Sequence, residues 1–305
     1  MNSKHMIKSL ACAAALCGSV RAEASEAESE SPGLRWAMGE GVTFDEKPIV
    51  SSEVALAFDS KFMSYGLVDN NDPILTPSAS LTFLDWVTFG VSAIFDTSRY
   101  GRKAGYGSRA FRYQELDPGV SIGHSFGPDA GGLPTTVAFE LGYMYEAHPR
   151  AVGDDTQFLT FSVGLPDLWF EPAFSCERDI DRDRGTYLNL EVGHSFAVVE
   201  GREAGADDVL SFRVSLAQGW GDSRRVDAYL GEAGEGLSRQ SLMDTCVKGE
   251  FTWNIADGVS LGAYIAYYDY LFDSSARDCA RAYEATGAHT DSSSFVTGFA
   301  LAVSF

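Results

Sequence analysis

Apolar and polar side chains alternate with a period of two over most of the chain from residue 51 onward. The pattern is clearest in the last thirteen residues, where large apolar side chains share one parity and small side chains share the other. The apolar row consists of Phe295, Phe299, Leu301, Val303 and Phe305, and only Thr297 interrupts it. Successive side chains of a β-strand point to opposite faces, so this pattern predicts a strand with one apolar face.

Twelve segments follow this alternation, and most are close to or somewhat longer than the roughly 9–11 residues that a tilted strand needs to cross a bilayer. They are Ser52–Tyr65, Pro77–Leu84, Trp86–Thr97, Arg112–Phe126, Pro134–Ala147, Thr156–Leu165, Leu168–Glu177, Thr186–Val199, Asp208–Gly219, Ser241–Asn254, Val259–Phe272 and Ser293–Phe305. The predicted fold class is all-β: a transmembrane, antiparallel, up-and-down β-barrel of about 12 strands, within a range of about 10 to 14. Pro118 and Pro172 each remove a ladder hydrogen bond, and we expect a β-bulge at each.

The connections between these segments alternate between short and long. Even-numbered connections such as Asp85 and 255–258 are short, whereas odd-numbered connections such as 220–240 and 273–292 are long. The connection 200–207 is an exception, because it is no shorter than two of the odd-numbered ones. A barrel with short inner turns and longer outer loops has this alternation. An ordinary soluble β-sandwich, the alternative for the terminal strand, has no reason to show it.

The beginning of the chain has the pattern of a secretory signal peptide. Lys4 and Lys8 are basic, residues 7–20 form a short apolar core, and Ala22 offers a small residue for cleavage, with Ala24 as the alternative. The residues that follow are acidic and lack a sustained period, which predicts disorder. The predicted organisation is a signal peptide at 1–22, an acidic, disordered periplasmic tail at 23–50, and the barrel at 51–305.

Composition supports a chain of many strands. It contains 31 glycines and 12% aromatic residues, which suits strands that carry aromatic belts. The chain has 43 acidic and 23 basic residues and a formal net charge of −20, and cleavage of the signal would remove three basic residues and no acidic one. This balance argues against nucleic acid as a partner and against a polybasic membrane-surface protein. No apolar run of about 18 residues follows the N-terminal segment, so no membrane-spanning helix is predicted.

The end of the chain resembles a known class of proteins. Phe305 is a terminal aromatic residue, and Phe299, Leu301 and Val303 precede it at alternate positions. The segment resembles the closing strand of a bacterial outer-membrane β-barrel, where these residues form the signal for the barrel assembly machinery. The resemblance implies a location in the bacterial cell outer membrane, with outer-membrane lipid and the assembly machinery as partners. The closing strand must pair with the first strand to complete the barrel.

The beginning of the predicted barrel has a second, looser resemblance. It rests on Ser-Glu-Val-Ala-Leu at 52–56, Gly-Leu-Val-Asp-Asn at 66–70 and Pro-Ser-Ala-Ser-Leu at 77–81. These residues resemble the first two strands of a family of outer-membrane porins. The resemblance implies passage of small solutes, without indicating which solute, and it leaves the oligomeric state open.

Charged residues share the parity opposite to the apolar row on several strands, and we expect them to face the lumen. An unpaired charge facing hydrocarbon costs about 2–4 kcal/mol at the bilayer midplane. The expected selectivity residues are Glu140, Glu171, Glu191, Arg213, Lys248 and Glu250. Because acidic rings select cations, the predicted function is a narrow, passive, cation-tolerant channel for small polar solutes. The alternative is a packed, non-conducting barrel with a structural or surface-interaction role. A short helix predicted at 275–285 could narrow the mouth.

Aromatic residues recur at the predicted strand ends, as they do in the two girdles of membrane barrels. The inner girdle is expected to contain Trp86, Phe126, Phe196 and Trp253, and the outer one Tyr65, Tyr100, Trp220, Tyr270 and Phe272. Gly-His-Ser-Phe occurs at 123–126 and again at 193–196, both at inner strand ends. Consecutive strand residues face opposite sides, so His124 cannot activate Ser125 as a nucleophile. We therefore interpret both repeats as girdle segments.

An enzyme is the remote alternative. A family of twelve-stranded outer-membrane lipases carries a Ser-His-Asn arrangement near the outer rim, which raises the possibility of a barrel-embedded lipid hydrolase. The histidines do not match it, because His124 and His194 lie at the inner end, and His148 and His289 lie in outer loops without the required spacing. The chain is not expected to be an enzyme, and no catalytic residue or cofactor is predicted.

Three cysteines lie outside the signal segment: Cys176, Cys246 and Cys279. An odd number in an exported protein leaves at least one unpaired. Cys246 and Cys279, at the outer ends of neighbouring elements, form a possible disulfide. No Cys-x-x-Cys pair is present, so a structural zinc site is not expected and no metal ligand is predicted.

Overall fold

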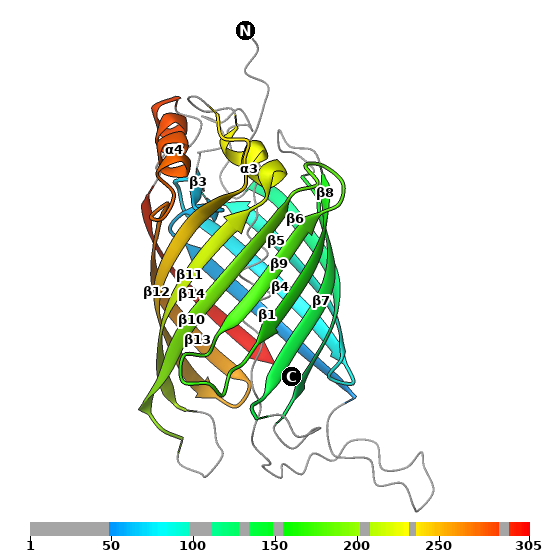
Figure 1. Ribbon diagram of the computed structural model, residues 1–305. Helices are drawn as coiled ribbons and strands as arrows, with labels where there is room; N and C mark the ends of the chain where they lie inside the picture. The colour runs from blue at the N-terminus through cyan, green and yellow to red at the C-terminus, as the bar shows by residue number, and fades with distance from the viewer. Residues whose placement is uncertain are drawn as a thin grey trace, which may run out of the picture.

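The computed structural model describes residues 49–97, 112–127, 134–148, 155–201, 208–231, 236–286 and 293–305. In this part of the chain, twelve antiparallel strands form a closed barrel (Figure 1). They are β1 (Val50–Asp59), β4 (Ile74–Phe83), β5 (Val87–Asp96), β6 (Arg112–Phe126), β7 (Val137–Glu146), β8 (Thr156–Gly164), β9 (Ala173–Asp179), β10 (Thr186–Val199), β11 (Leu210–Gly221), β12 (Ser241–Ala256), β13 (Val259–Asp269) and β14 (Ser294–Ser304). The predicted all-β, up-and-down barrel of 12 strands is confirmed.

The barrel closes between its first and last strands, as expected. The β1–β14 ladder runs from Glu53 opposite Ser304 to Asp59 opposite Gly298 without a register shift. A side chain at Gly298 would overlap the Asp59 carboxylate and the Tyr264 ring, so only glycine fits at this point of the seam. The two ends of the chain are therefore joined by a continuous antiparallel ladder.

The alternation of side chains follows the two faces of the barrel wall. On β7, Leu141 is 56% exposed on the outside, whereas its neighbour Gly142 and the side chains of Met144 and Glu146 are buried inside. Large apolar side chains are exposed in the same way on β5, β12 and β14, as Phe89, Phe251 and Phe299 illustrate. The outer surface is therefore apolar, and the polar side chains turn inward. Among the described residues, neither helix has the length and apolar character to cross a membrane.

The predicted first strand, Ser52–Tyr65, is wrong at its C-terminal end. β1 ends at Asp59, and the chain then forms a separate hairpin of β2 (Phe62–Ser64) and β3 (Leu67–Asn70). The turn of this hairpin has positive φ angles at Tyr65 (45°) and Gly66 (82°). A Cβ at Gly66 would also overlap Asp244, so the hairpin fits against the barrel wall only with glycine here. Because a hairpin keeps the period of two, the sequence pattern did not reveal the break.

The two prolines are accommodated without the predicted bulges. Pro172 precedes β9, which begins at Ala173 rather than at Leu168, so it lies in the turn and not in the ladder. Pro118 stays in register opposite Val91, and the shift in the β5–β6 ladder lies between Ile94 and Phe95. On the other side of β6, the ladder to β7 is interrupted. It pairs Gly119 with Met144 and then resumes only at the isolated bridge between Leu116 and Ala147. The ladder therefore omits a pair at Pro118, where the backbone lacks a donor.

Two helices lie at one end of the barrel, and the short turns lie at the other (Figure 1). We call these the helical end and the turn end. The helix predicted at 275–285 is confirmed as α4 (Ser274–Thr286), whereas α3 (Ser223–Leu230) was not predicted because it lies within a long connection of mixed composition. Asp222 caps α3 by accepting hydrogen bonds from the backbone N–H groups of Arg224 and Arg225. The predicted signal peptide, nearly all of the acidic tail, Tyr100 and His289 lie outside the described residues.

Candidate functional site: the lumen and its plug

The helical end of the barrel is filled by what we call the plug, which consists of the β2–β3 hairpin (62–70), α3 and α4. An apolar cluster joins these elements to the inner face of the wall. It contains Tyr65, Leu67, Met144, Phe158, Val226, Tyr229, Leu230, Leu237, Met243, Tyr270, Ala276, Cys279 and Ala280. The burial of so much apolar surface inside a barrel holds the plug in place, at about 25 cal/mol for each Å² removed from water.

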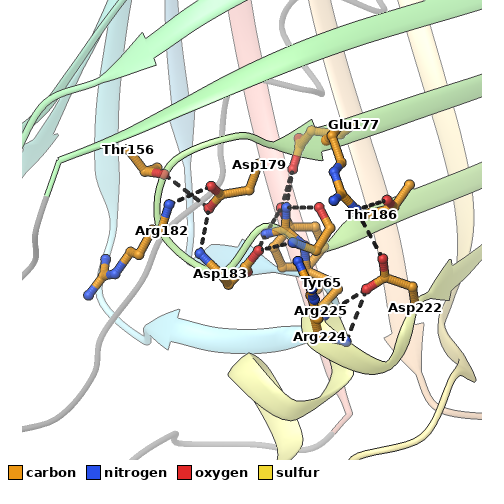
Figure 2. A network of polar contacts seen from close by, with 12 residues as sticks. Tyr65, Thr156, Glu177, Asp179, Arg182, Asp183, Thr186, Asp222, Arg224 and Arg225 are labelled. Carbon is orange, nitrogen blue, oxygen red and sulfur yellow. Dashed lines mark hydrogen bonds and ion pairs between the residues drawn. The ribbon is translucent and has the colours of Figure 1, made fainter.

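Arg225 of α3 is the polar centre of the plug (Figure 2). Its side chain is 1% exposed and forms ion pairs with Glu177 (3.3 Å) and Asp183 (3.3 Å). Its Nη1 also donates a hydrogen bond to Tyr65 Oη (3.0 Å), which in turn donates to Glu177 Oε1 (2.5 Å). Burial raises the pKa of Tyr65 well above its usual value, so this phenol stays protonated and able to donate.

Of the two acids that pair with Arg225, Glu177 lies on β9 and Asp183 lies in the connection between β9 and β10. Asp179 accepts hydrogen bonds from Thr156 Oγ1 (3.0 Å) and from the backbone N–H of Arg182 (2.8 Å), which fixes the turn that carries Asp183 (Figure 2). Gly185 closes the turn, and its lack of a side chain lets the α3 backbone at Arg225 approach. The β9–β10 turn and α3 are thereby held against each other at the helical end of the barrel.

Two predicted girdle residues belong to the buried apolar cluster at the helical end instead. Tyr270 is fully buried, and its hydroxyl donates to the backbone carbonyl of Tyr65 (2.5 Å). Tyr65 is 8% exposed and stacks edge-on against Tyr187 and Tyr229. The prediction that Tyr65 and Tyr270 lie in an outer girdle is therefore wrong. Both follow the end of a barrel strand, where the chain leaves the wall and strand parity no longer decides the direction of a side chain.

Five of the predicted selectivity residues lie on the inner face of the wall between the plug and the turn end, and the sixth, Glu171, lies in the β8–β9 turn. Lys248 and Glu250 form an ion pair on β12 (2.6 Å), with their side chains 34% and 32% exposed. Arg213 on β11 forms ion pairs with Glu191 (3.1 Å) and with Glu171. These groups are paired, but they are much more exposed than Arg225, so this half of the lumen is less densely filled than the helical end.

Glu171 and Glu140 differ in where they lie, because Glu171 is in a turn and Glu140 is on a strand. Glu171 lies in the β8–β9 turn with a positive φ of 38°, not on a strand, and it accepts a hydrogen bond from the backbone N–H of Ser195 (2.8 Å). Because β10 extends beyond β9, this carboxylate satisfies a donor that has no strand partner. Glu140 lies on the inner face of β7 opposite Gly123, as predicted. Whether these side chains select ions stays a prediction.

The predicted inner girdle surrounds the turn end on the outside of the barrel. Trp86, Phe126, Phe196 and Trp253 are between 37% and 48% exposed. The repeated Gly-His-Ser-Phe segments have the same environment, since His124 stacks on Trp86 (ring centroids 4.2 Å apart) and His194 stacks on Trp169 (4.8 Å). Both histidines thus belong to an outward aromatic belt. Trp220 of the predicted outer girdle is half-buried and pairs with Leu242 across the β11–β12 ladder.

The possible disulfide between Cys246 and Cys279 is not formed, and none of the three described cysteines is disulfide-bonded. Cys279 lies on α4 in the apolar cluster of the plug, whereas Cys246 lies on β12 opposite Tyr268 of β13. The two thiols therefore lie in different surroundings, one in the cluster and the other on the β12–β13 ladder. One further group was missed because Glu115 is distant in the chain from Glu146 and His148: the three residues have ligand atoms within 4.8 Å of one another.

Comparisons with known proteins point to similar barrels. A scan against protein-family models finds no matching family, and a search of curated protein sequences finds no match. An outer-membrane channel of Pseudomonas putida F1 has 8% identity and a TM-score of 0.46, over 88% of this chain and 100% of that one. The outer-membrane channel DcaP of Acinetobacter baumannii has 10% identity and a TM-score of 0.36, over 84% and 96%. The outer-membrane protein Omp33 of the same species has 10% identity and a TM-score of 0.33, over 84% and 98%. These values describe a general likeness and assign no residue or solute.

Proposed function

We propose that the protein is a narrow outer-membrane channel for small polar solutes, with cations tolerated, and that the plug restricts its helical end. The observation that carries this proposal is the contrast between the two halves of the lumen. Charged side chains such as Lys248 and Glu250, near the middle of β12, are about one-third exposed, while Arg225 in the plug is almost completely buried. A partly open, charged vestibule is what a small polar solute requires.

The outer surface supports a membrane location. A closed barrel leaves no unpaired strand edge, which is a condition for crossing lipid with β-strands. The outer wall exposes large apolar side chains, which suit contact with lipid hydrocarbon: Phe89, Leu141, Phe251 and Phe299. The aromatic belt at the turn end has the composition of side chains that lie at a membrane–water interface. In this orientation the turn end faces the periplasm and the helical end faces outward. We also propose that the predicted signal peptide is cleaved when the protein is exported.

Ion selectivity gives the experiment for this function. In planar bilayers with a salt gradient, the wild-type protein should give a reversal potential that indicates cation preference. Replacing Glu140→Gln together with Glu250→Gln should move the reversal potential toward zero, because two luminal carboxylates lose their charge. Asp257→Asn, in the exposed β12–β13 turn, is the matched control and should change nothing. A reversal potential that is the same in all three proteins would remove these carboxylates from the conduction path.

A second function is favoured by a specific observation, the dense packing of the plug. A barrel whose helical end is closed by buried ion pairs and an apolar cluster suits a non-conducting structural or surface-interaction protein. The absence of current from folded wild-type protein and also from protein without the β2–β3 hairpin would favour this alternative. A lipid hydrolase has less support, because His124 and His194 are stacked on tryptophans in the outer aromatic belt.

A further inference from the structure

Three side chains with metal-binding atoms meet at the helical end of β6 and β7. Glu115 lies on β6, Glu146 is the last residue of β7, and His148 follows two residues later. His148 Nε2 is 3.4 Å from Glu115 Oε2 and 3.2 Å from Glu146 Oε1. One candidate atom from each residue lies within 4.8 Å of the others, so a single ion could contact all three.

The backbone explains why these residues converge. Leu116 and Ala147 form an isolated bridge with two backbone hydrogen bonds of 2.9 Å. Continuing this antiparallel register by one residue places His148 opposite Glu115. Glu146 and His148 are two positions apart, so they face the same side of an extended chain. The arrangement therefore follows from the pairing of the barrel wall and does not depend on a freely moving loop.

A further contact fixes the backbone at His148. Asp155, at the start of the next described segment, accepts a hydrogen bond from the N–H of His148 (2.9 Å) and another from Tyr145 Oη (2.5 Å). These two hydrogen bonds hold the pKa of Asp155 below its usual value, so it is ionised at neutral pH. The segment that carries the imidazole is thus anchored on the outer side of β7 while the ring points inward.

The cluster contains more negative charge than its own residues can balance. Glu115 and Glu146 are each 2% exposed, and Glu115 Oε1 and Glu146 Oε2 have no hydrogen-bond partner. The charges of Asp117 on β6, which also shares a hydrogen bond with Glu115, and of Asp69 in the plug hairpin act on Glu115, whereas the charges of Arg225 and Arg182 act on Glu146 with the opposite sign. Burying carboxylates with unsatisfied oxygens is costly unless a cation or a proton compensates them. Two unpartnered, fully buried carboxylate oxygens beside an imidazole therefore indicate a missing positive charge.

We propose that Glu115, Glu146 and His148 bind one divalent cation of the first transition row, with Zn²⁺ or Mn²⁺ as the best fit. One imidazole and two carboxylates form a donor set that suits these ions. Ca²⁺ is a poorer fit, because it takes six to eight oxygen ligands. A bound ion would join β6 to β7 beside the plug. This inference does not depend on conduction, since it needs only the folded barrel.

The competing explanation is a proton instead of a metal ion. A protonated His148 between Glu115 and Glu146, with a further proton on one carboxyl group, would also reduce the charge. The two explanations differ in a direct measurement, because only the first predicts saturable metal binding. Zn²⁺ should be titrated by calorimetry into the full-length chain, folded in detergent and freed of metal with a chelator. The expected result is one equivalent of Zn²⁺ per chain.

Variants locate the site. His148→Ala and Glu146→Gln should each weaken Zn²⁺ binding at least about tenfold, since each removes a direct ligand. Glu140→Gln is the matched control, because Glu140 lies six residues from Glu146 on the same face of β7, and it should bind like the wild type. Folding of each variant is checked by its heat-modifiable mobility on a gel. If His148→Ala does not fold, Glu115→Gln replaces it.

The visible absorption of bound Co²⁺ provides a second measurement, because it reports the ligands of the ion and not the stability of the barrel. Co²⁺ bound in place of Zn²⁺ should give visible absorption bands in the wild type and in Glu140→Gln, and these bands should change in energy or disappear in His148→Ala. The inference is overturned if wild-type protein shows no saturable binding of Zn²⁺ or Mn²⁺. It is also overturned if His148→Ala and Glu146→Gln bind as tightly as the control, since the ion would then lie elsewhere.

Discussion

At the scale of single residues, Arg225 is the group on which the polar part of the plug depends. It contacts Glu177, Asp183 and Tyr65, and its guanidinium lies over the rings of Tyr65 (5.0 Å) and Phe158 (5.6 Å). A buried arginine is tolerated here because its charge is matched by two carboxylates. Removing it would leave those carboxylates buried without a counter-charge.

Replacing Arg225 should therefore be strongly destabilising. We expect Arg225→Met to lower the free energy of unfolding by about 3–5 kcal/mol, the usual cost of breaking a buried ion pair by deleting one partner. Urea unfolding in lipid vesicles, followed by tryptophan fluorescence, measures this quantity. Arg224→Met is the matched control on the same helix, since Arg224 is exposed, and it should change the stability little. Equal stabilities for the two variants would show that the network around Arg225 contributes nothing.

The residue-scale predictions from sequence succeeded where strand parity decides the direction of a side chain. Glu140, Lys248 and Glu250 lie on the inner face, and Phe251 lies on the outer one, because lipid and lumen impose opposite requirements on alternate positions. Parity could not identify Arg225, which comes from an unpredicted helix. Its partners Tyr65 and Glu177 are 160 and 48 residues away in the chain. The alternation of neighbouring residues contains no information about contacts at such separations.

At the scale of elements, α4 depends on the residue that precedes it. Asp273 accepts hydrogen bonds from the backbone N–H of Ser275 (2.9 Å) and from Ser241 Oγ (2.8 Å), and it forms an ion pair with Arg239 (3.2 Å). Burial disfavours the ionised form of Asp273, but its hydrogen bonds outweigh this effect and hold its pKa below the usual value. The carboxylate therefore caps the helix and ties it to β12.

This pKa predicts a pH dependence for α4. A carboxyl group with a lowered pKa in the folded state stabilises that state above the unfolded pKa of about 3.9, and the stabilisation is lost as the pH falls through the folded pKa. The protection of 274–286 against hydrogen exchange, expressed relative to the intrinsic exchange rate at each pH, should therefore fall below about pH 4. Asp273→Ala should accelerate exchange at neutral pH by an amount that corresponds to about 0.5–2 kcal/mol, the cost of losing an N-cap.

The control for α4 is Asp278→Ala, because Asp278 is an exposed residue in the same helix. It should exchange like the wild type between pH 4 and pH 7. If Asp273→Ala and Asp278→Ala have the same effect on exchange, the capping role of Asp273 is wrong.

The terminal strand provides the second prediction at this scale. The backbone of Phe305 exchanges hydrogen bonds with Ser52 (3.1 and 2.8 Å), and its side chain is 76% exposed. Deleting Phe305 removes both hydrogen bonds and the terminal aromatic group, so the yield of heat-modifiable, folded protein in cell membranes should fall severalfold. Phe305→Ala keeps the backbone hydrogen bonds and separates the two contributions. A deletion variant that assembles as well as Glu140→Gln would contradict the assembly role of this residue.

A helix or strand could be predicted from the sequence when all of its residues have the same kind of surroundings, because the pattern of side chains then continues from one end to the other. The strands β6 and β10 were predicted with their observed bounds, and α4 within one residue at each end, because lipid contact or helix-forming composition marks every position. The β2–β3 hairpin and α3 were missed. Both fold against the interior of the barrel, where burial is set by neighbours distant in sequence, and the hairpin retains the alternation of a single long strand.

At the scale of the whole molecule, the barrel is divided into two unlike halves. The helical end contains the apolar cluster of the plug, the Arg225 side chain and the Glu115–Glu146–His148 cluster, which are all buried. The turn end contains exposed ion pairs inside and an aromatic belt outside. Sequence alternation predicted the barrel, its closure and its acidic lumen, but left open whether the lumen is open or packed. That question depends on three-dimensional packing, and the two halves differ in it.

The central claim is that the plug restricts a channel, and unitary conductance tests it most directly. Asp59 and Ile74 are paired directly across the β1–β4 ladder, so residues 60–73 can be replaced by a two-residue Asn-Gly turn without altering the register of the wall. In planar bilayers, we predict that wild-type protein gives small current steps and that the shortened variant gives steps several times larger. Equal steps from the two proteins would show that the hairpin does not restrict a channel, and the absence of current from both, despite heat-modifiable folding, would contradict a channel altogether.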